Sequence, residues 1–308
     1  MSHLLEIQNV VKKYGNHTAL NQVSMSIPQQ GIYGLLGPNG AGKTSLIRII
    51  NQIIYPDAGQ VLFKGEPLSA KHISQIGYMP EERGLYKSMK VQEQALYLGQ
   101  LKGLSKAEAK CNMNEWLDRL EIGDWRNKKM EELSKGMAQK VQFLVTVLHQ
   151  PSLLIFDEPF SGFDPVNANL IKDQILYLKE QGTTIVFSTH RMESVEELCD
   201  SIALIHHSQK ILEGKVSEIK KQYKTNTYQI GIFPTNESLF LSELAGQYTY
   251  ELSDFDSMNQ ELKIQVQVKD TLKSQELLSF LMTQGTVTHF SEKIPSINDI
   301  FIQAINQS

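Results

Sequence analysis

Residues 37–44 have the sequence Gly37-Pro38-Asn39-Gly40-Ala41-Gly42-Lys43-Thr44, which matches the phosphate-binding pattern G-x-x-x-x-G-K-[ST]. An apolar run from Ile32 to Leu36 precedes this loop, and an apolar helical pattern from Leu46 to Ile50 follows it. In a strand, loop and helix of this kind, backbone N–H groups turn inward and the helix N-terminus adds partial positive charge. An ordinary glycine-rich turn is the alternative, but the flanking strand and helix favour a nucleoside triphosphate site.

The loop also supplies the individual contacts that such a nucleotide needs. Lys43 should reach the β- and γ-phosphates, and the Thr44 hydroxyl should bind Mg²⁺. The candidate nucleotide-binding residues of this stretch are Gly37, Pro38, Asn39, Gly40, Ala41, Gly42, Lys43, Thr44 and Ser45.

The composition is that of an ordinary globular protein. The 308 residues are 41% hydrophobic and 21% charged, and this length allows one large domain and a smaller one. A net charge of −4 leaves no basic surplus for a nucleic-acid surface. We therefore expect no nucleic-acid partner.

Neither secretion nor membrane spanning is indicated. Polar residues such as Glu6 and Lys12 interrupt the first apolar positions, unlike the apolar core of a signal peptide. No apolar run approaches the roughly 20 residues needed to cross a bilayer. Cys111 and Cys199 are far apart without metal-ligand spacing, and we expect two reduced, packed thiols. Any role at a membrane therefore requires a partner.

From about residue 82 to 148, helical periods dominate the sequence. Residues 91–102, 106–120 and 137–149 carry apolar residues at helical spacing, and Ser105 with Glu108 forms a capping-box pattern. Leu133-Ser134-Lys135-Gly136-Met137 opens the last of these helices. Taken alone, this stretch is either a second anion site or a plain N-cap, and the N-cap is the simpler explanation. The sequence thus predicts a helical subdomain inserted into an α/β core.

Two carboxylates directly follow an apolar strand. Residues 153–156 run into Asp157 and Glu158, at what would be the carboxyl edge of a parallel sheet. Asp157 is then placed to hold Mg²⁺ through water and Glu158 to polarise the attacking water, as phosphoryl transfer requires. A strand ending in two solvated acids is the alternative. Another apolar strand, residues 183–188, brings Thr189 and His190 to the same edge.

Residues 37–44, 133–137 and 153–158, in this order and spacing, resemble the motifs of the ATP-binding subunit of an ABC transporter. The resemblance covers residues 1–220 and implies a P-loop NTPase core of the ABC type. It also implies that two such domains, as a homodimer, sandwich two ATP molecules head to tail. Each ATP would contact the glycine loop of one copy and Ser134 and Gly136 of the other.

The resemblance implies further roles for single residues. Tyr14 resembles the aromatic residue that stacks on adenine, and Asp164 the acid of the dimer loop. Asp157 resembles the metal-site carboxylate, Glu158 the catalytic base and His190 the histidine that senses the γ-phosphate. ATP and Mg²⁺ are the implied cofactors. The implied activity is ATP hydrolysis that powers separate integral membrane permease subunits, at the cytoplasmic face of the cell membrane.

Two positions depart from the family pattern. Glu81 stands where the family usually has a glutamine; it could still face Mg²⁺ or its waters, but a carboxylate donates no hydrogen bond. The signature has the sequence LSKGM instead of LSGGQ, with Lys135 and Met137 as the substitutions. Ser134, Gly136 and the helix N-terminus remain, so we expect phosphate recognition to survive.

Residues 221–308 predict a small α+β domain. Residues 262–268 alternate between apolar and polar side chains, as in a half-buried strand, and residues 227–233 form a weaker strand pattern. Residues 272–283 and 296–305 have helical patterns, with a short strand at 286–290 between them. The segment resembles the accessory domain of bacterial exporter ATPases, which favours export by analogy.

Three other functions compete with the transporter subunit. A soluble ABC ATPase of translation or DNA repair would show fused ATPase domains or long coiled-coil insertions, which this chain lacks. A non-catalytic ATP-binding scaffold does not need the retained Lys43, Asp157, Glu158 and His190. A P-loop GTPase would need an N-K-x-D sequence, and there is none. Nothing in the sequence identifies a transported substrate.

Overall fold

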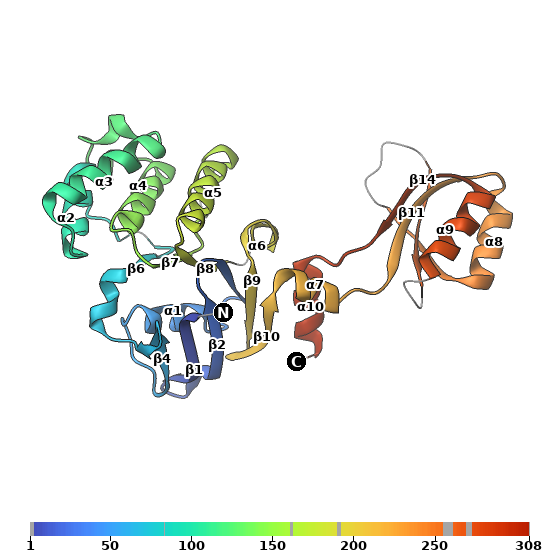
Figure 1. Cartoon of the computed structure of the whole chain (residues 1–308), viewed down its shortest axis with the longest axis horizontal. Helices are drawn as coiled ribbons and strands as arrows, with labels where there is room; N and C mark the ends of the chain where they lie inside the picture. Colours follow the sequence, from blue (N-terminus) through green and yellow to red (C-terminus); the bar gives the residue numbers. More distant parts are fainter. Residues whose placement is uncertain are drawn as a thin grey trace. The chain divides into compact units, whose positions relative to one another are not determined.

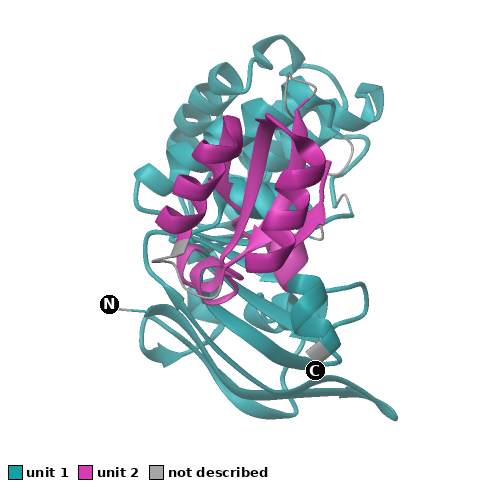
Figure 2. Ribbon diagram, turned by 90° about the vertical axis from the view of Figure 1, so that its right-hand side faces the viewer, with its two compact units in different colours: residues 1–216, 301–308 teal, residues 217–300 magenta. Residues whose placement is uncertain are grey.

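The structure is a computed structural model that describes residues 3–82, 84–160, 163–189, 192–254, 261–268 and 273–307. The chain forms two compact units, residues 1–216 with 301–308 and residues 217–300 (Figure 1, Figure 2). The domain boundary predicted at residue 220 falls within helix α7 (Val216–Gln222) and stays a prediction.

A six-stranded sheet with the order β10-β9-β3-β8-β7-β6 forms the centre of the first unit. Five strands pair in parallel, and β10 is antiparallel to β9 at one edge. All residues of β3, β7 and β8 are buried, which explains their unbroken apolar sequences. The bounds are β3 Ile32–Leu36, β6 Ile76–Met79, β7 Leu153–Asp157, β8 Thr184–Ser188, β9 Ser201–His206 and β10 Gln209–Lys215.

A second, antiparallel sheet has the order β2-β1-β4-β5. Its buried side chains share one core with those of helix α1 (Lys43–Ile50). Tyr14 is the last residue of β1 and pairs with His17 across the β1–β2 hairpin. The bounds are β1 His3–Tyr14, β2 His17–Pro28, β4 Ala58–Phe63 and β5 Glu66–Pro67.

Helices α2 (Val91–Leu101), α3 (Lys106–Arg119) and α4 (Lys135–Val147) form the inserted helical subdomain at one end of this unit (Figure 1). Trp116 of α3 packs edge-on against Phe143 of α4, with ring centroids 5.9 Å apart. Helix α4 begins at Lys135, two residues before the predicted start, because Ser134 caps it. The other helices of the unit are α5 Pro165–Glu180, α6 Met192–Leu198 and the 3₁₀ segments η1 Ala70–Gln75, η2 Gly123–Trp125 and η3 Met130–Glu132.

The second unit is a small α+β domain with the element order β-α-β-β-α-β, the ferredoxin-like arrangement. Its antiparallel sheet has the order β12-β13-β11-β14, and α8 and α9 lie beside each other (Figure 1), with Phe240 stacked on Phe280. The bounds are β11 Thr227–Pro234, α8 Glu237–Gln247, β12 Thr249–Leu252, β13 Leu262–Gln267, α9 Lys273–Gln284 and β14 Gly285–Glu292, and α10 spans Ile297–Gln307.

Helix α4 packs directly on the strands of the central sheet. A Cβ atom on Gly77 of β6 would lie 2.6 Å from the Thr146 carbonyl oxygen of α4. One turn earlier in α4, Phe143 stacks on Phe156 of β7, with ring centroids 5.5 Å apart and planes at 15°. The helix is therefore held against β6 and β7 without space for a side chain at Gly77.

Gly77→Ala should destabilise the protein, because the added methyl group must push α4 away from β6. We expect the free energy of unfolding to fall by about 1–3 kcal/mol, the usual cost of overpacking a core, measured by denaturant unfolding. Gly123→Ala is the matched control, because no non-neighbouring atom lies within 4 Å of the Cβ it would add. Equal stability of the two variants would contradict this packing.

Two basic side chains meet at the start of β6. Lys102 donates from Nζ to the carbonyl oxygens of Ile73 and Ile76, at 2.8 and 2.7 Å. His149, only 9% exposed, has Nε2 at 3.3 Å from the same Ile76 oxygen. Burial, with the positive charge of Lys102, lowers the pKa of His149 to about 4. His149 is therefore neutral near pH 7.

His149 should make the stability depend on pH in acid. Its pKa rises from about 4 in the folded chain to the ordinary 6.5 after unfolding, so the unfolded chain binds more protons between these values and stability falls as the pH is lowered through them. His149→Gln should flatten this fall by up to about 3 kcal/mol. The check is urea unfolding of both proteins at pH 7 and pH 4.5, and equal losses would contradict the prediction.

Candidate functional site

Four neighbouring parallel strands end at the edge where the sequence predicts the site. They lie in the order β3-β8-β7-β6, with Ser188 opposite both Leu35 and Asp157. The phosphate loop follows β3, and the other predicted residues follow β8, β7 and β6. Because ligands of open α/β sheets bind outside the carboxyl ends of the strands, the topology by itself gathers these residues.

The phosphate loop has a backbone that only glycine can follow at two positions. Gly37 has φ of 149°, and a Cβ atom there would lie 2.2 Å from the Ile205 carbonyl oxygen. Gly42 has φ of 114°, and its Cβ atom would lie 2.3 Å from the Ala19 carbonyl oxygen. Both values lie in the region that favours glycine. The pattern in the sequence thus has a steric cause.

The tip of the loop is open to solvent. The Ala41 N–H donates to the Pro38 carbonyl oxygen at 3.2 Å, which closes a tight turn, and α1 begins two residues later at Lys43. The side chain of Thr44 is exposed and that of Ser45 is half-buried, in the first turn of the helix. The exposed residues at the tip are Pro38, Asn39 and Gly40.

Lys43 lies under this loop and is only 8% exposed. Its Nζ donates to the carbonyl oxygens of Gly37 at 2.6 Å and Pro38 at 3.1 Å. Burial lowers the pKa of Lys43, and the negative charges of Glu158, Asp157 and Glu81 oppose this shift. The loop therefore holds a cation where the N-terminus of α1 adds its own partial positive charge.

The carboxylates form one cluster near this cation. Asp157, the last residue of β7, is 7% exposed, and burial raises its pKa. The charges of Glu158 and Glu81 raise the pKa of Asp157 further, and Lys43 opposes them. Like charges in one place favour a cation between them. Glu81, which follows β6, thus acts on the same electrostatic region as the two acids after β7.

Glu158 is held by the neighbouring strand. Its φ is 50°, uncommon for a residue other than glycine, and its N–H donates to the Ser188 carbonyl oxygen at 2.9 Å. The Thr189 hydroxyl donates to Oε2 of Glu158 at 3.0 Å, and Thr189 is 2% exposed. The sequence placed Thr189 at this edge without a role. Its position directly after β8, beside the acids after β7, is the signal that could have indicated one.

Three other predicted residues lie at different elements. Tyr14 ends β1 and is 45% exposed, with Nζ of Lys12 5.7 Å from its ring centroid. Ser134 and Gly136 lie at the start of α4, where the Ser134 hydroxyl accepts from the Met137 N–H at 3.3 Å. The side chains of Tyr14 and Ser134 therefore make local contacts in this chain.

Asp164 caps helix α5. Its Oδ1 accepts from the N–H groups of Val166 and Asn167, both at 3.0 Å. The bonds to Asn167 hold the pKa of the exposed Asp164 below its usual range. His190 lies outside the described residues, so its predicted role stays a prediction, as do the roles of Tyr14, Ser134, Gly136 and Asp164.

The donor atoms at this edge suit a hard cation such as Mg²⁺. The hydroxyl of Thr44 and the carboxylates of Asp157 and Glu81 are oxygen donors, and Mg²⁺ prefers one or two carboxylates together with substrate phosphates. Among the described residues, no group of three or more His, Cys, Asp or Glu side chains could hold a metal ion. The residues therefore fit a metal that binds with a phosphate rather than a closed protein cage.

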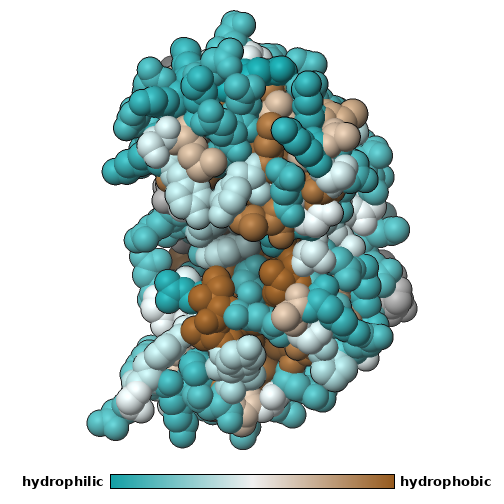
Figure 3. Space-filling model, turned by 90° about the vertical axis from the view of Figure 1, so that its left-hand side faces the viewer, coloured by the Kyte–Doolittle hydropathy of each residue, from teal (hydrophilic) through white to brown (hydrophobic). Residues whose placement is uncertain are grey.

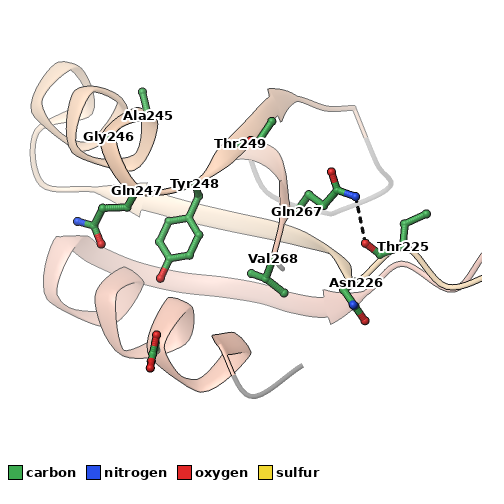
Figure 4. Close-up of a pocket in the computed structure, with 10 residues that line it drawn as sticks. Thr225, Asn226, Ala245, Gly246, Gln247, Tyr248, Thr249, Gln267 and Val268 are labelled. Atoms are coloured by element: carbon green, nitrogen blue, oxygen red, sulfur yellow. Dashed lines mark hydrogen bonds between the residues drawn. The ribbon is translucent and has the colours of Figure 1, made fainter. Parts of the chain in front are cut away.

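The second unit has a separate pocket of about 820 Å³. Figure 4 shows the side chain of Tyr248, the residue between α8 and β12, and the Gln267 amide donating to the Thr225 carbonyl oxygen. Most of the lining is polar and exposed, and none of the residues predicted to bind nucleotide belongs to it. This pocket is therefore distinct from the nucleotide site.

The chain was compared with known proteins. The family model described as ABC transporter matches residues 20–161, and the model for the C-terminal domain of DrrA1-3-like ATP-binding proteins matches residues 214–305. Over 302 residues the chain is 41% identical to YhaQ, an ABC transporter ATP-binding protein of Bacillus subtilis, covering 98% of each protein. This chain belongs to the ATP-binding subunits of ABC transporters.

Further comparisons agree with this family. The chain is 30% identical to the linearmycin resistance ATP-binding protein LnrL of Bacillus subtilis, over 94% of this chain and 92% of that protein. A solved ATP-binding subunit of an ABC transporter has a TM-score of 0.67 and 29% identity, over 71% of this chain and 93% of that one. The subunit therefore binds ATP and hydrolyses it in transport, as predicted.

ATP-binding subunits of ABC transporters work with separate transmembrane subunits. No helix among the described residues of this subunit is long and apolar enough to cross a membrane.

Proposed function

We propose that this subunit is the ATPase of a bacterial ABC exporter and works as a homodimer on separate permease subunits. The observation that carries the proposal is that Lys43, Asp157, Glu158 and Glu81 lie at or just after the ends of neighbouring strands, where their charges act on one another. A phosphate-binding cation and an oriented carboxylate are the two parts that phosphoryl transfer to water requires.

Glu158 is the proposed general base. Its carboxylate is aimed by the Thr189 hydroxyl at 3.0 Å and its backbone by the bond to Ser188, so little reorientation is needed when water arrives. A base positioned in this way takes the proton of the attacking water as the water oxygen bonds to the γ-phosphorus. The bond from the γ-phosphorus to the oxygen that bridges to the β-phosphate breaks in the same step, and ADP is the leaving group. Lys43 holds the β- and γ-phosphates in place, because its ammonium lies beneath the loop that surrounds them.

Thr44, Asp157 and Glu81 are the proposed residues around Mg²⁺. When bound, Mg²⁺ neutralises the charge that develops on the phosphate oxygens. Burial and the neighbouring acids raise the pKa of Asp157 and so disfavour its charged form. A bound cation would offset this effect by favouring the charged carboxylate, which agrees with the proposed role. Glu81 adds a third negative charge where the family usually has a neutral amide, so we expect tighter Mg²⁺ binding than a glutamine would give.

The homodimer would complete each ATP site. Ser134 and Gly136 stand at the exposed N-terminus of α4, and we propose that they contact the γ-phosphate bound by the other copy. Tyr14, 45% exposed, is the proposed stacking partner of adenine. Asp164 and His190 are proposed to act at the dimer loop and at the γ-phosphate.

Export from the cytoplasmic face is the proposed direction. Two findings support it: the match to the C-terminal domain of DrrA1-3-like proteins and the likeness to a relative named for linearmycin resistance. Resistance to a compound is commonly gained by removing it from the cell, so an exporter fits both. The transported compound would be bound by the permease subunits.

An apolar surface is the proposed contact with the permease. We call it the Leu101 surface, and its proposed members are the exposed residues Ile53, Tyr55, Tyr86, Tyr97 and Leu101. Figure 3 shows apolar side chains gathered in the middle of the face that carries α2 and β6. Tyr86 packs edge-on against Tyr97 at 5.9 Å, and Lys102 joins the end of α2 to the Ile73 carbonyl oxygen.

The occupant we propose for this surface is a helix of the transmembrane subunit. Such subunits are the established partners of the family, and exposed apolar patches commonly mark protein contacts. Because its proposed members lie on α2, on the segment before it and on the segment that follows α1, a helix seated there would contact both the helical subdomain and the core.

Glu158→Gln should abolish hydrolysis while ATP still binds. We expect phosphate release to fall by about 100-fold or more, the usual effect of losing a general base, and a stable ATP-dependent dimer to form in size-exclusion chromatography with light scattering. Lys43→Ala should instead weaken ATP binding. Glu180→Gln, an exposed acid at the end of α5, is the control. Turnover at the wild-type rate in Glu158→Gln would remove Glu158 from its role, and a monomer at saturating Mg-ATP would overturn the dimer.

Leu101→Asp should release the permease without affecting the nucleotide. We expect the amount of transmembrane subunit that co-purifies from native membranes in mild detergent to fall about tenfold or more, because a buried unpaired charge costs several kcal/mol. Binding of ATP to the purified variant should match the wild type. Lys110→Asp, on an exposed position of α3, is the control for added negative charge. Undiminished co-purification of Leu101→Asp would exclude this surface.

A further inference from the structure

Helix α4 carries two buried glutamines on one side. Gln139 is 6% and Gln142 is 4% exposed. Residues three apart on a helix are neighbours on its surface, so the two amides point from the same face. Buried amides are costly unless they form hydrogen bonds, and the bonds that these two form lead to the two acidic loops of the site.

Gln139 is bonded to the loop that contains Glu158. Its Nε2 donates to the Pro159 carbonyl oxygen at 2.9 Å, and this contact is buried. Pro159 directly follows Glu158, so the bond restrains the backbone next to the acid. Glu158 is thus held from β8 and from α4.

Gln142 is bonded to the loop that contains Glu81. Its Nε2 donates to the Pro80 carbonyl oxygen at 2.8 Å. Pro80 follows Met79, the last residue of β6, and directly precedes Glu81. A carboxylate at position 81 donates no hydrogen bond of its own, so the loop is restrained by a donor that comes from α4.

The helix between these bonds is a rigid connection. Phe143 stacks on Phe156, which directly precedes Asp157, and the Thr146 carbonyl lies against Gly77 of β6. Gly136 and Gln142 are about 9 Å apart along the helix axis at 1.5 Å per residue. The start of α4 and the two loops therefore cannot move independently of each other.

We propose that Gln139 and Gln142 are positioning residues that couple the start of α4 to the loops of Glu158 and Glu81. Contact of Ser134 and Gly136 with a nucleotide would displace α4, and the two amide bonds would carry that displacement to both acids. Hydrolysis would then respond to engagement of the helix start. The inference rests on the proposed roles of Glu158, Glu81 and the signature residues.

The test replaces each glutamine by methionine, which keeps the length and removes the donor. Gln139→Met and Gln142→Met should each lower kcat about fivefold to tenfold, the effect of one lost hydrogen bond in the active conformation. The KM for ATP should stay within about twofold, because the phosphate loop and Lys43 are unchanged. The measurement is steady-state phosphate release by the purified chain.

Gln174→Met is the matched control. Gln174 of α5 is also a buried glutamine, 8% exposed. Its Oε1 accepts a hydrogen bond from Nε of Arg119 at 2.8 Å, so it is bonded to neither acidic loop. We expect Gln174→Met and the two test variants to lower the melting temperature, since losing a buried amide hydrogen bond costs stability wherever it lies. Gln174→Met should nevertheless keep kcat within about twofold of the wild type. An equal fall of kcat in the control would overturn the inference.

Hydrogen exchange supplies a second readout that stability alone would not move. With ATP bound, Gln142→Met should speed amide exchange in residues 78–82 and leave residues 157–160 unchanged. Gln139→Met should speed exchange in residues 157–160 and leave residues 78–82 unchanged. Exchange that rises equally in both segments, or in neither, would overturn the coupling. If the methionine variants do not fold, Gln139→Asn and Gln142→Asn keep the polarity, are too short to reach the carbonyls, and carry the same expectations.

Glu158→Gln separates this inference from the proposed function. If Glu158→Gln loses hydrolysis while Gln139→Met and Gln142→Met keep the wild-type kcat, the coupling fails and the proposed site stands. If Glu158→Gln keeps wild-type turnover, the proposed site fails, and the inference fails with it.

Discussion

The ATP site depends on one constraint of topology: four parallel strands end at the same edge while α4 lies against two of them. This order brings Lys43, Glu81 and the adjacent pair Asp157 and Glu158 to one edge, although these three positions lie far apart in the sequence. Gly37 and Gly77 make the arrangement possible, the first by a backbone that only glycine can follow and the second by leaving space for α4.

The central sheet and most of the site could be predicted because their signals are local and strong. Apolar runs such as residues 32–36 and 153–156 are buried on both faces, so nearly every position is constrained. In the phosphate loop, steric contacts require glycine at two positions, and the negative charges of the site favour a lysine at a third. Sequence alone also led to the family, and the comparisons confirm it.

Other features could not be predicted because their cause is a distant contact. The sequence predicts no helix at the position of α8, because its apolar residues do not form one stripe. Phe240 is buried, whereas its neighbour Leu239 is 54% exposed. The sequence also missed β12, a strand of only four residues at a sheet edge. Gln139 and Gln142 look like ordinary polar positions of a helix, and only the carbonyls of Pro159 and Pro80 explain why they are buried.

The strand pairing also decides when the protein can first bind ATP during its synthesis. Ile32 of β3 pairs with Ile185 of β8, and Ile76 of β6 with Leu153 of β7. Closing such long loops costs entropy before the contacts form, whereas the helices between β6 and β7 rely on nearby contacts and fold fast. A chain still on the ribosome has its phosphate loop early but lacks the strands on both sides of β3 until residues 188 and 206 have emerged. Nucleotide binding therefore has to wait until the central sheet has formed around β3.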